Sequence, residues 1–563
     1  MLDHSDHYEQ NRSRENSSDF ALMELMKNDF PPMNPDIANG LAVKHIPYAE
    51  KYVDDIIRIS AEGYPPEFKY LGCQRCTPIE EFNEVTRNKN NKQSFDIAVS
   101  YLYMVKYFFE YKGVKLPPRY IYLPFVTDAG IMMLSNSRYM ISPVLMDRII
   151  SLDANSVFIR VSRDKLTFNR LQNDIKINGV REPVQVAWAT IYHRRKTTRT
   201  EVGVTAKCSL MHYLCGKYGF TTTFQVFGKC TPIVGEEEIN EQTYPPEEWV
   251  ICQRATDLKP KTGQKGLYNP TNIRLAIRKE EFTPMVRSMV SGFYYVVTHF
   301  PDRLILDPDP RNDKMQYLDS PRLWMILLGK ILFSGLVSEG KLFDDINKHY
   351  TSLNEYVDAK VKMDMEDVGH PCETIYDMFA LVIGSMDDWM VESSAKVSSM
   401  YNKELNILYN VLFDLRSAIF TFYFKIIDAT SKNPSEKEIV NLMNTHLRTG
   451  AIYGIVKQKA YASTFSYSGD NKLPKVTTTL VPQSKVSDNN QGGKSSKSPI
   501  TDPSAQLHVS VIEIGNYLNL PKSDPSGIAR INPHVAVSNK GEVLRNPKFV
   551  PLLDSIQEII KRK

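Results

Sequence analysis

The stretch NNQGGKSSKS, residues 489–498, contains a Gly-Gly-Lys-Ser sequence of the kind that holds phosphates in nucleotide-binding enzymes. A phosphate loop needs another glycine five residues before Gly493, because both turns must expose backbone N–H groups to the phosphates. That position is Asp488, whose carboxylate would repel the ligand. We therefore interpret the stretch as a flexible linker and predict no cofactor.

Two of the seven cysteines, Cys73 and Cys76, have the close spacing of a zinc ligand pair. A second close pair should complete the site, but Cys208 and Cys215 are separated by a helical-looking segment and the other three stand alone. The N-terminus also lacks the pattern of an export signal, so reduced, isolated thiols are expected. We predict no structural metal.

Acidic residues raise the possibility of metal-assisted catalysis. Asp307, Asp309 and Asp313 could ligate a hard cation, but the prolines between them favour a stiff segment with no glycine for a calcium-loop turn. His212 and His299 lie among aromatic helical residues and are expected to be core or interface histidines. We find no catalytic motif, and we favour a non-enzymatic chain over a metal-dependent enzyme.

The densest basic cluster lies in YHRRKTTRT, between two apparent strands. Such a hairpin tip could neutralise phosphates, while Tyr192 could stack on a base. The alternative is a turn that is polar only because it faces water. The net charge of +4 is small for 563 residues, so a nucleic-acid site would have to be a local patch, made here by His193, Arg194, Arg195, Lys196 and Arg199.

The order of predicted elements indicates an α+β fold, in which an N-terminal mixed antiparallel-sheet domain precedes a mainly helical domain, with extended arms at both ends. A capping box with proline predicts a helix over 77–85, and Gly219 should end another helix that starts near 207. Asn136-Ser137 and Arg163-Asp164 are predicted hairpin turns. Strands are predicted at 100–111, 119–126, 130–142, 156–168 and 184–193, and later helices at 285–300, 322–333, 373–384, 404–424 and 437–450.

We divide the chain into a flexible N-terminal arm (1–46), an α+β domain (47–249), a mainly helical domain (250–483), a flexible linker (484–503) and a C-terminal docking arm (504–563). The last segment is too short for a core of its own, yet it contains two apolar stripes. The residues predicted to dock on a partner are Val511, Ile514, Leu518, Leu520, Leu552, Leu553, Ile556 and Ile559.

No apolar stretch is long enough to span a bilayer, because the apolar run that begins near Leu323 is broken by Gly329 and Lys330. We expect no association with a membrane.

Several phrases, among them RYIYLPFVTDAGIMML, LMHYLCGKYGFTTTF and LNLPKSDPSGIARINP, resemble a family of tailed-bacteriophage proteins with no assigned activity. The organisation, an α+β domain, a second domain and terminal arms, is also similar to that of the nuclear-shell protein of large phages. The resemblance implies a location in the host cell cytoplasm or in the virion.

Our main hypothesis from the sequence is a non-enzymatic phage structural or assembly protein that associates with neighbouring copies or a partner through its terminal arms. The alternative is a phage replication or transcription accessory protein that binds nucleic acid through the basic hairpin. Salt-dependent binding to DNA or RNA would distinguish the two hypotheses.

Overall fold

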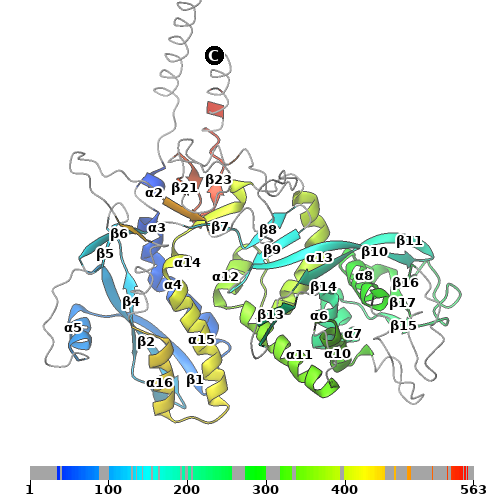
Figure 1. Ribbon diagram of the computed structural model, residues 1–563, viewed down its shortest axis with the longest axis horizontal. Helices are drawn as coiled ribbons and strands as arrows, with labels where there is room; N and C mark the ends of the chain where they lie inside the picture. The colour runs from blue at the N-terminus through cyan, green and yellow to red at the C-terminus, as the bar shows by residue number, and fades with distance from the viewer. Residues whose placement is uncertain are drawn as a thin grey trace, which may run out of the picture. The chain divides into compact units, whose positions relative to one another are not determined.

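The computed structural model divides the chain into two compact units (Figure 1). Unit 1 comprises Met1–Arg148 and Ser398–Lys563, and unit 2 comprises Ile149–Val397. The structure describes residues 34–38, 41–87, 100–127, 131–134, 136–141, 144–153, 156–162, 165–190, 193–196, 201–204, 207–255, 273–299, 318–332, 338–393, 399–449, 462–464, 479–482, 510, 529–530, 534–548, 551–552 and 555.

Unit 1 is built on an antiparallel sheet in which β2 (Leu102–Tyr111) is central. On one side β2 pairs with β1 (Phe68–Arg75), and on the other side it pairs with β3 (Val114–Lys115) and β4 (Arg119–Pro124). Helix α4 (Ala49–Ala61) packs against β1 and against α15 (Phe413–Thr430), which comes from the other end of the chain. Helices α2 (Pro35–Ala38), α3 (Ala42–His45), α5 (Pro78–Arg87), α14 (Leu408–Val411) and α16 (Glu436–His446) complete the helical part of the unit.

Aromatic packing joins the two segments of the chain that make up unit 1. The rings of Phe68 and Phe109 lie 5.5 Å apart between centroids, and the ring of Phe422 lies 5.9 Å from Phe68. All three side chains are buried, and edge-to-face contacts of this kind stabilise a core beyond the area that they bury. The N-terminal sheet therefore depends on α15 for its core.

Two smaller sheets of unit 1 also combine distant segments. One contains β5 (Ile131–Leu134), β6 (Ser137–Ile141) and β19 (Ala462–Thr464). The other runs in the order β18 (Lys403–Asn406), β7 (Val144–Asp147), β20 (Thr479–Pro482), β21 (Ala529–Arg530). The C-terminal hairpin, which we define as β22 (Ala536–Val537), β23 (Val543–Leu544) and the turn between them, lies against β18, since the Leu405 N–H donates to the carbonyl of Gly541.

Unit 2 contains an eight-stranded antiparallel sheet. Its strands are β8 (Ile150–Asp153), β9 (Ser156–Arg160), β10 (Lys165–Ile177), β11 (Val180–Thr190), β14 (Lys207–Ser209), β15 (Ile233–Gly235), β16 (Trp249–Arg254) and β17 (Arg274–Arg278). Strands β10 and β11 form the long ribbon at the right of Figure 1. Residue 249 is the predicted end of the α+β domain. The sheet contains strands from both sides of this boundary, because β10 pairs with both β9 and β16.

Helices pack on this sheet and on one another to form the core of unit 2. Trp324, Tyr213 and Phe379 are buried in it, and α8 lies along β11. The helices are α6 (Leu210–Tyr218), α7 (Phe220–Thr223), α8 (Pro284–His299), α10 (Pro321–Leu332), α11 (Glu339–Leu353), α12 (Ala359–Asp367) and α13 (Ile375–Ser393). Within the described part of the chain, no helix combines the length and the apolarity that crossing a bilayer requires.

Local sequence signals explain where several of these elements begin and end. Helix α5 starts at Pro78, where the Thr77 N–H donates to the Glu80 carboxylate and the Glu80 N–H donates to the Thr77 hydroxyl, as predicted. Helix α6 ends at Gly219, whose φ of 84° is the left-handed conformation that favours glycine. The predicted α+β class, with antiparallel sheets and a mainly helical region, is confirmed.

Candidate nucleic-acid interface

Most of the predicted basic cluster lies in a strand of unit 2. Strand β12 (His193–Lys196) contains His193, Arg194, Arg195 and Lys196, and it pairs antiparallel with β13 (Glu201–Val204). The register places Lys196 opposite Glu201, while Arg199 lies outside the described residues. We call β12 and β13 the basic hairpin.

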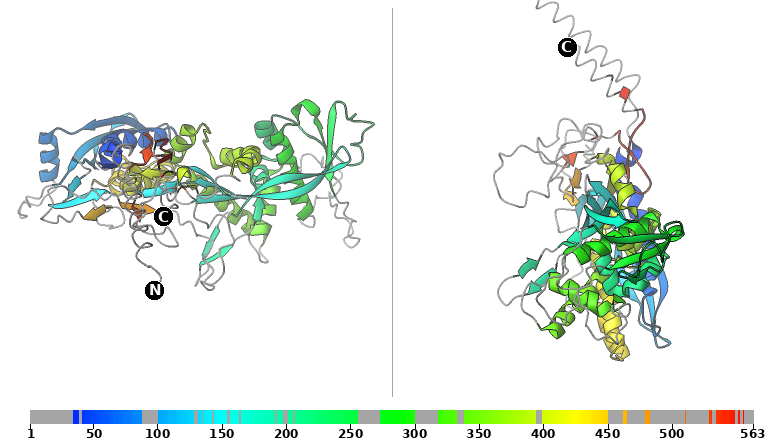
Figure 2. Two further views of the ribbon diagram at one scale, coloured as in Figure 1. Left: turned by 90° about the horizontal axis from the view of Figure 1, so that it is seen from above. Right: turned by 90° about the vertical axis from the view of Figure 1, so that its right-hand side faces the viewer.

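The basic hairpin lies in the sequence between two strands that pair in the main sheet. Strand β11 ends at Thr190 and β14 begins at Lys207, and these two residues pair with each other. Figure 2 shows the short β12 and β13 arrows extending away from the helices of unit 2. Strand β11 belongs to the long β10–β11 ribbon, which is closed by a turn at Asn178 and Gly179 with positive φ at both.

The composition of the basic hairpin suits it to contact phosphates. Residues 193–204 include four basic side chains and one carboxylate, which leaves a net charge of +3 with histidine neutral. Lysine and arginine neutralise phosphates, and a two-stranded antiparallel ribbon is narrow enough to enter the major groove of DNA. The local charge is thus nearly as large as the net charge of +4 of the whole chain.

His212 belongs to the core of unit 2, as predicted. Its Nε2 donates to the Trp324 carbonyl at 2.9 Å, and its side chain is buried. Burial lowers the pKa of His212 to about 4, although the bond to the Trp324 carbonyl acts in the opposite direction. This imidazole is therefore neutral in the folded unit at physiological pH.

The stability of unit 2 is expected to fall between pH 6.5 and pH 4. Below pH 6.5 the unfolded chain takes up a proton at His212, whereas the folded unit takes it up only near pH 4. The loss approaches about 3 kcal/mol at the acidic end of this window. Denaturant unfolding of His212→Gln, which keeps an N–H donor, should show a smaller pH dependence than the wild type. Equal slopes for wild type and His212→Gln would contradict the prediction.

The cysteines are free thiols in both units. Burial raises the pKa of Cys73 and of Cys76 to about 11, so each carries its proton near neutral pH. Among the described residues, no group of three or more histidine, cysteine, aspartate or glutamate side chains is placed to hold a metal ion.

Other residues singled out from the sequence fall largely outside the described part. Leu552 is buried in unit 1. The acidic residues Asp307, Asp309 and Asp313, the stretch 489–498 and the remaining predicted docking residues, Val511, Ile514, Leu518, Leu520, Leu553, Ile556 and Ile559, lie outside it. The side chain of His299 also lies outside the description, although its backbone ends α8.

A family model described as "Non-virion RNA polymerase subunit" matches residues 22–558. The match covers nearly the whole chain, so the class of protein is a phage transcription component. The chain belongs to the non-virion RNA polymerase subunit family. No curated protein matches the chain.

Membership in this family corrects the function predicted from the sequence. The main hypothesis, a structural or assembly protein that acts through its terminal arms, is wrong, because the family is a component of the transcription machinery. The phage origin is confirmed, whereas the similarity to the nuclear-shell protein finds no support. As a polymerase subunit the chain associates with other phage proteins, and a non-virion polymerase acts in the host cell after infection.

Proposed function

We propose that the chain contributes nucleic-acid contacts to a phage RNA polymerase through the basic hairpin. The observation that carries this proposal is the placement of Arg194, Arg195 and Lys196 on one strand of a two-stranded ribbon that lies in the sequence between β11 and β14, which pair with each other in the main sheet of unit 2. Membership in a polymerase subunit family supplies the context in which such a ribbon meets DNA or RNA. In this role the chain binds and positions nucleic acid within the polymerase.

Replacing Arg194, Arg195 and Lys196 together by alanine is expected to weaken binding to DNA. Each phosphate contact releases a counterion, so the slope of log affinity against log salt should become shallower by up to about three. Fluorescence anisotropy with single-stranded and double-stranded oligonucleotides at several salt concentrations measures this slope. The fold should be retained, because β12 pairs with β13 in a two-stranded sheet of its own and contributes no strand to the eight-stranded sheet of unit 2.

A matched triple variant separates a local contact from a change in total charge. Lys279, Lys341 and Lys348 are exposed residues of unit 2, and their replacement by alanine removes the same charge elsewhere. This control should retain the wild-type slope. Conversely, Glu201→Gln removes the carboxylate opposite Lys196 and should strengthen binding. If both triple variants flatten the slope equally, the basic hairpin is not the contact site.

A further inference from the structure

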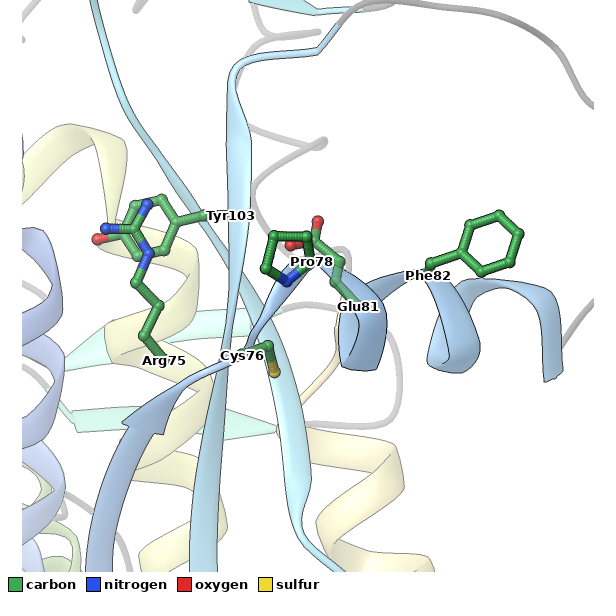
Figure 3. A pocket seen from close by; sticks show the side chains of 6 residues that line it. All are labelled: Arg75, Cys76, Pro78, Glu81, Phe82 and Tyr103. Carbon is green, nitrogen blue, oxygen red and sulfur yellow. The ribbon is translucent and has the colours of Figure 1, made fainter.

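A recess opens in unit 1 where β1 ends and α5 begins (Figure 3). Its volume is about 620 Å³, and its wall combines apolar, basic and acidic groups. The lining residues are Arg75, Cys76, Pro78, Glu81, Phe82 and Tyr103.

One wall of the recess is an arginine that is held in place by an aromatic ring. The guanidinium carbon of Arg75 lies 4.1 Å from the centroid of the Tyr103 ring, and Figure 3 shows the two groups stacked. Stacking uses the flat face of the guanidinium and leaves the N–H groups at its edge available to a carboxylate. Because Arg75 is exposed, this positioned donor faces solvent.

The other wall continues into an apolar surface of α5. Ile79 is 73% exposed and Phe82 is 64% exposed, values that are large for such side chains on a helix. The helix is itself well anchored, since the Glu80 carboxylate forms an ion pair with Lys106 of β2 at 2.8 Å and also closes the capping box. An ordered element thus presents these apolar side chains to solvent.

The charges around the recess favour a protein over a polyanion. Arg75 is accompanied by Glu81 in the recess, while Glu80 and Glu84 lie on the same helix. Three carboxylates on one short helix repel phosphates. A protein segment that carries an apolar side chain and a single acidic group brings fewer negative charges close to these carboxylates than a polyanion does, so it meets both the apolar surface and Arg75 with less repulsion.

We propose that this recess, together with the exposed surface of α5, docks another subunit of the polymerase. The partner segment inserts an apolar side chain beside Phe82 and Pro78 and presents a carboxylate to Arg75. The proposal rests on the membership of the chain in a polymerase subunit family, which requires surfaces that contact other subunits. It is independent of the proposed role of the basic hairpin.

The first test uses the full chain, co-expressed with the other polymerase subunits of the same phage, and follows its incorporation into the assembled enzyme by affinity and size-exclusion chromatography. Phe82→Ser should weaken incorporation about tenfold or more, as expected for a central anchor. Arg75→Ala should weaken it too, and Arg75→Lys should not restore it, because an ammonium group lacks the planar fork. The control Val114→Ser removes another exposed apolar side chain of unit 1, 46% exposed on β3, and should leave incorporation unchanged.

A second readout identifies what covers the surface. A photoreactive phenylalanine analogue at position 82 should cross-link to another polymerase subunit in the assembled enzyme. Cross-links to nucleic acid alone, or incorporation of folded Phe82→Ser at the wild-type level, would overturn the proposal. Circular dichroism of each variant confirms that it is folded. Failure here leaves the salt dependence of the basic hairpin unaffected, so the two proposals fail separately.

Discussion

Removal of residues 534–563 is expected to unfold much of unit 1 while unit 2 stays folded. Val535, Val543 and Leu552 are buried in unit 1, and burying an aliphatic side chain of this size contributes about 1.5–3 kcal/mol. The truncation also removes the acceptor of the buried Leu405 N–H and the partner of Arg148, whose guanidinium lies 3.3 Å from the Glu542 carboxylate. Hydrogen exchange with mass spectrometry should show lost protection in β1, β2 and α15 and retained protection in β10 and β11.

Two point variants at neighbouring positions provide a matched test of how much the C-terminal hairpin stabilises unit 1. Val543 is fully buried and Leu544 is 41% exposed, although both belong to β23. Val543→Ala should destabilise unit 1 by about 2 kcal/mol, whereas Leu544→Ala should change its stability by less than about 0.5 kcal/mol. Equal effects of the two variants, or full protection in the truncated chain, would show that the C-terminal hairpin contributes little to the fold.

Gly219→Ala is expected to cause the largest loss of stability of any single substitution in unit 2 that we consider. At a φ of 84° an L-residue is strained, and an added Cβ would lie 2.5 Å from the backbone oxygen of Asp319. That backbone cannot easily retreat, because the Asp319 carboxylate accepts a hydrogen bond from the Thr221 N–H at 2.7 Å. Backbone strain and steric overlap together should lower the free energy of unfolding by at least about 3 kcal/mol, which denaturant unfolding measures.

Gly179→Ala is the control for the contribution of backbone conformation alone. Gly179 has a similar φ of 78°, but an added Cβ there has no atom within 4 Å. Replacing Gly179 by alanine should lower the free energy of unfolding by only about 1–2 kcal/mol. If the two variants were equally stable, the close approach of Asp319 to Gly219 would not contribute to the destabilisation of Gly219→Ala.

Local signals in the sequence predicted the elements whose ends are determined by nearby residues. The capping box at Thr77 and the glycine at 219 locate the start of α5 and the end of α6, because each acts within one helical turn. The turn at Asn178 and Gly179 was missed, although Asn-Gly between β-branched runs is a strong hairpin signal. That turn closes the longest ribbon of unit 2.

Long-range pairing could not be read from local patterns. Residues 404–406 were predicted to begin a helix, but they belong to β18, where Leu405 pairs with Leu145 and its N–H bonds to Gly541. A partner more than a hundred residues away decides the conformation of such a short segment. The same limit applies to α15, whose apolar side chains suit any core and give no indication that β1 is their partner.

The predicted function failed for a related reason. An apolar segment after a linker is expected to bury itself, but its composition does not say on which surface. Of the predicted docking residues, the structure describes Leu552, which is buried in unit 1 of the same chain. The sequence predicted the basic cluster at a hairpin tip, whereas the structure places residues 193–196 in strand β12. The stacking of Arg75 on Tyr103 depends on the pairing of β1 with β2 and was not predicted.

The composition of unit 1 from both ends of the chain has a consequence for synthesis on the ribosome. Unit 2 is a continuous segment that can fold as soon as Val397 has left the exit tunnel. The N-terminal sheet must wait for α15 and then for the C-terminal hairpin, about 400 residues after Arg148, which at ordinary elongation rates takes roughly 20–80 s. Until α15 has been synthesised, the nascent sheet exposes the apolar surface that α15 later covers. Completion of unit 1 therefore requires the C-terminal hairpin to have been synthesised and to have left the ribosome.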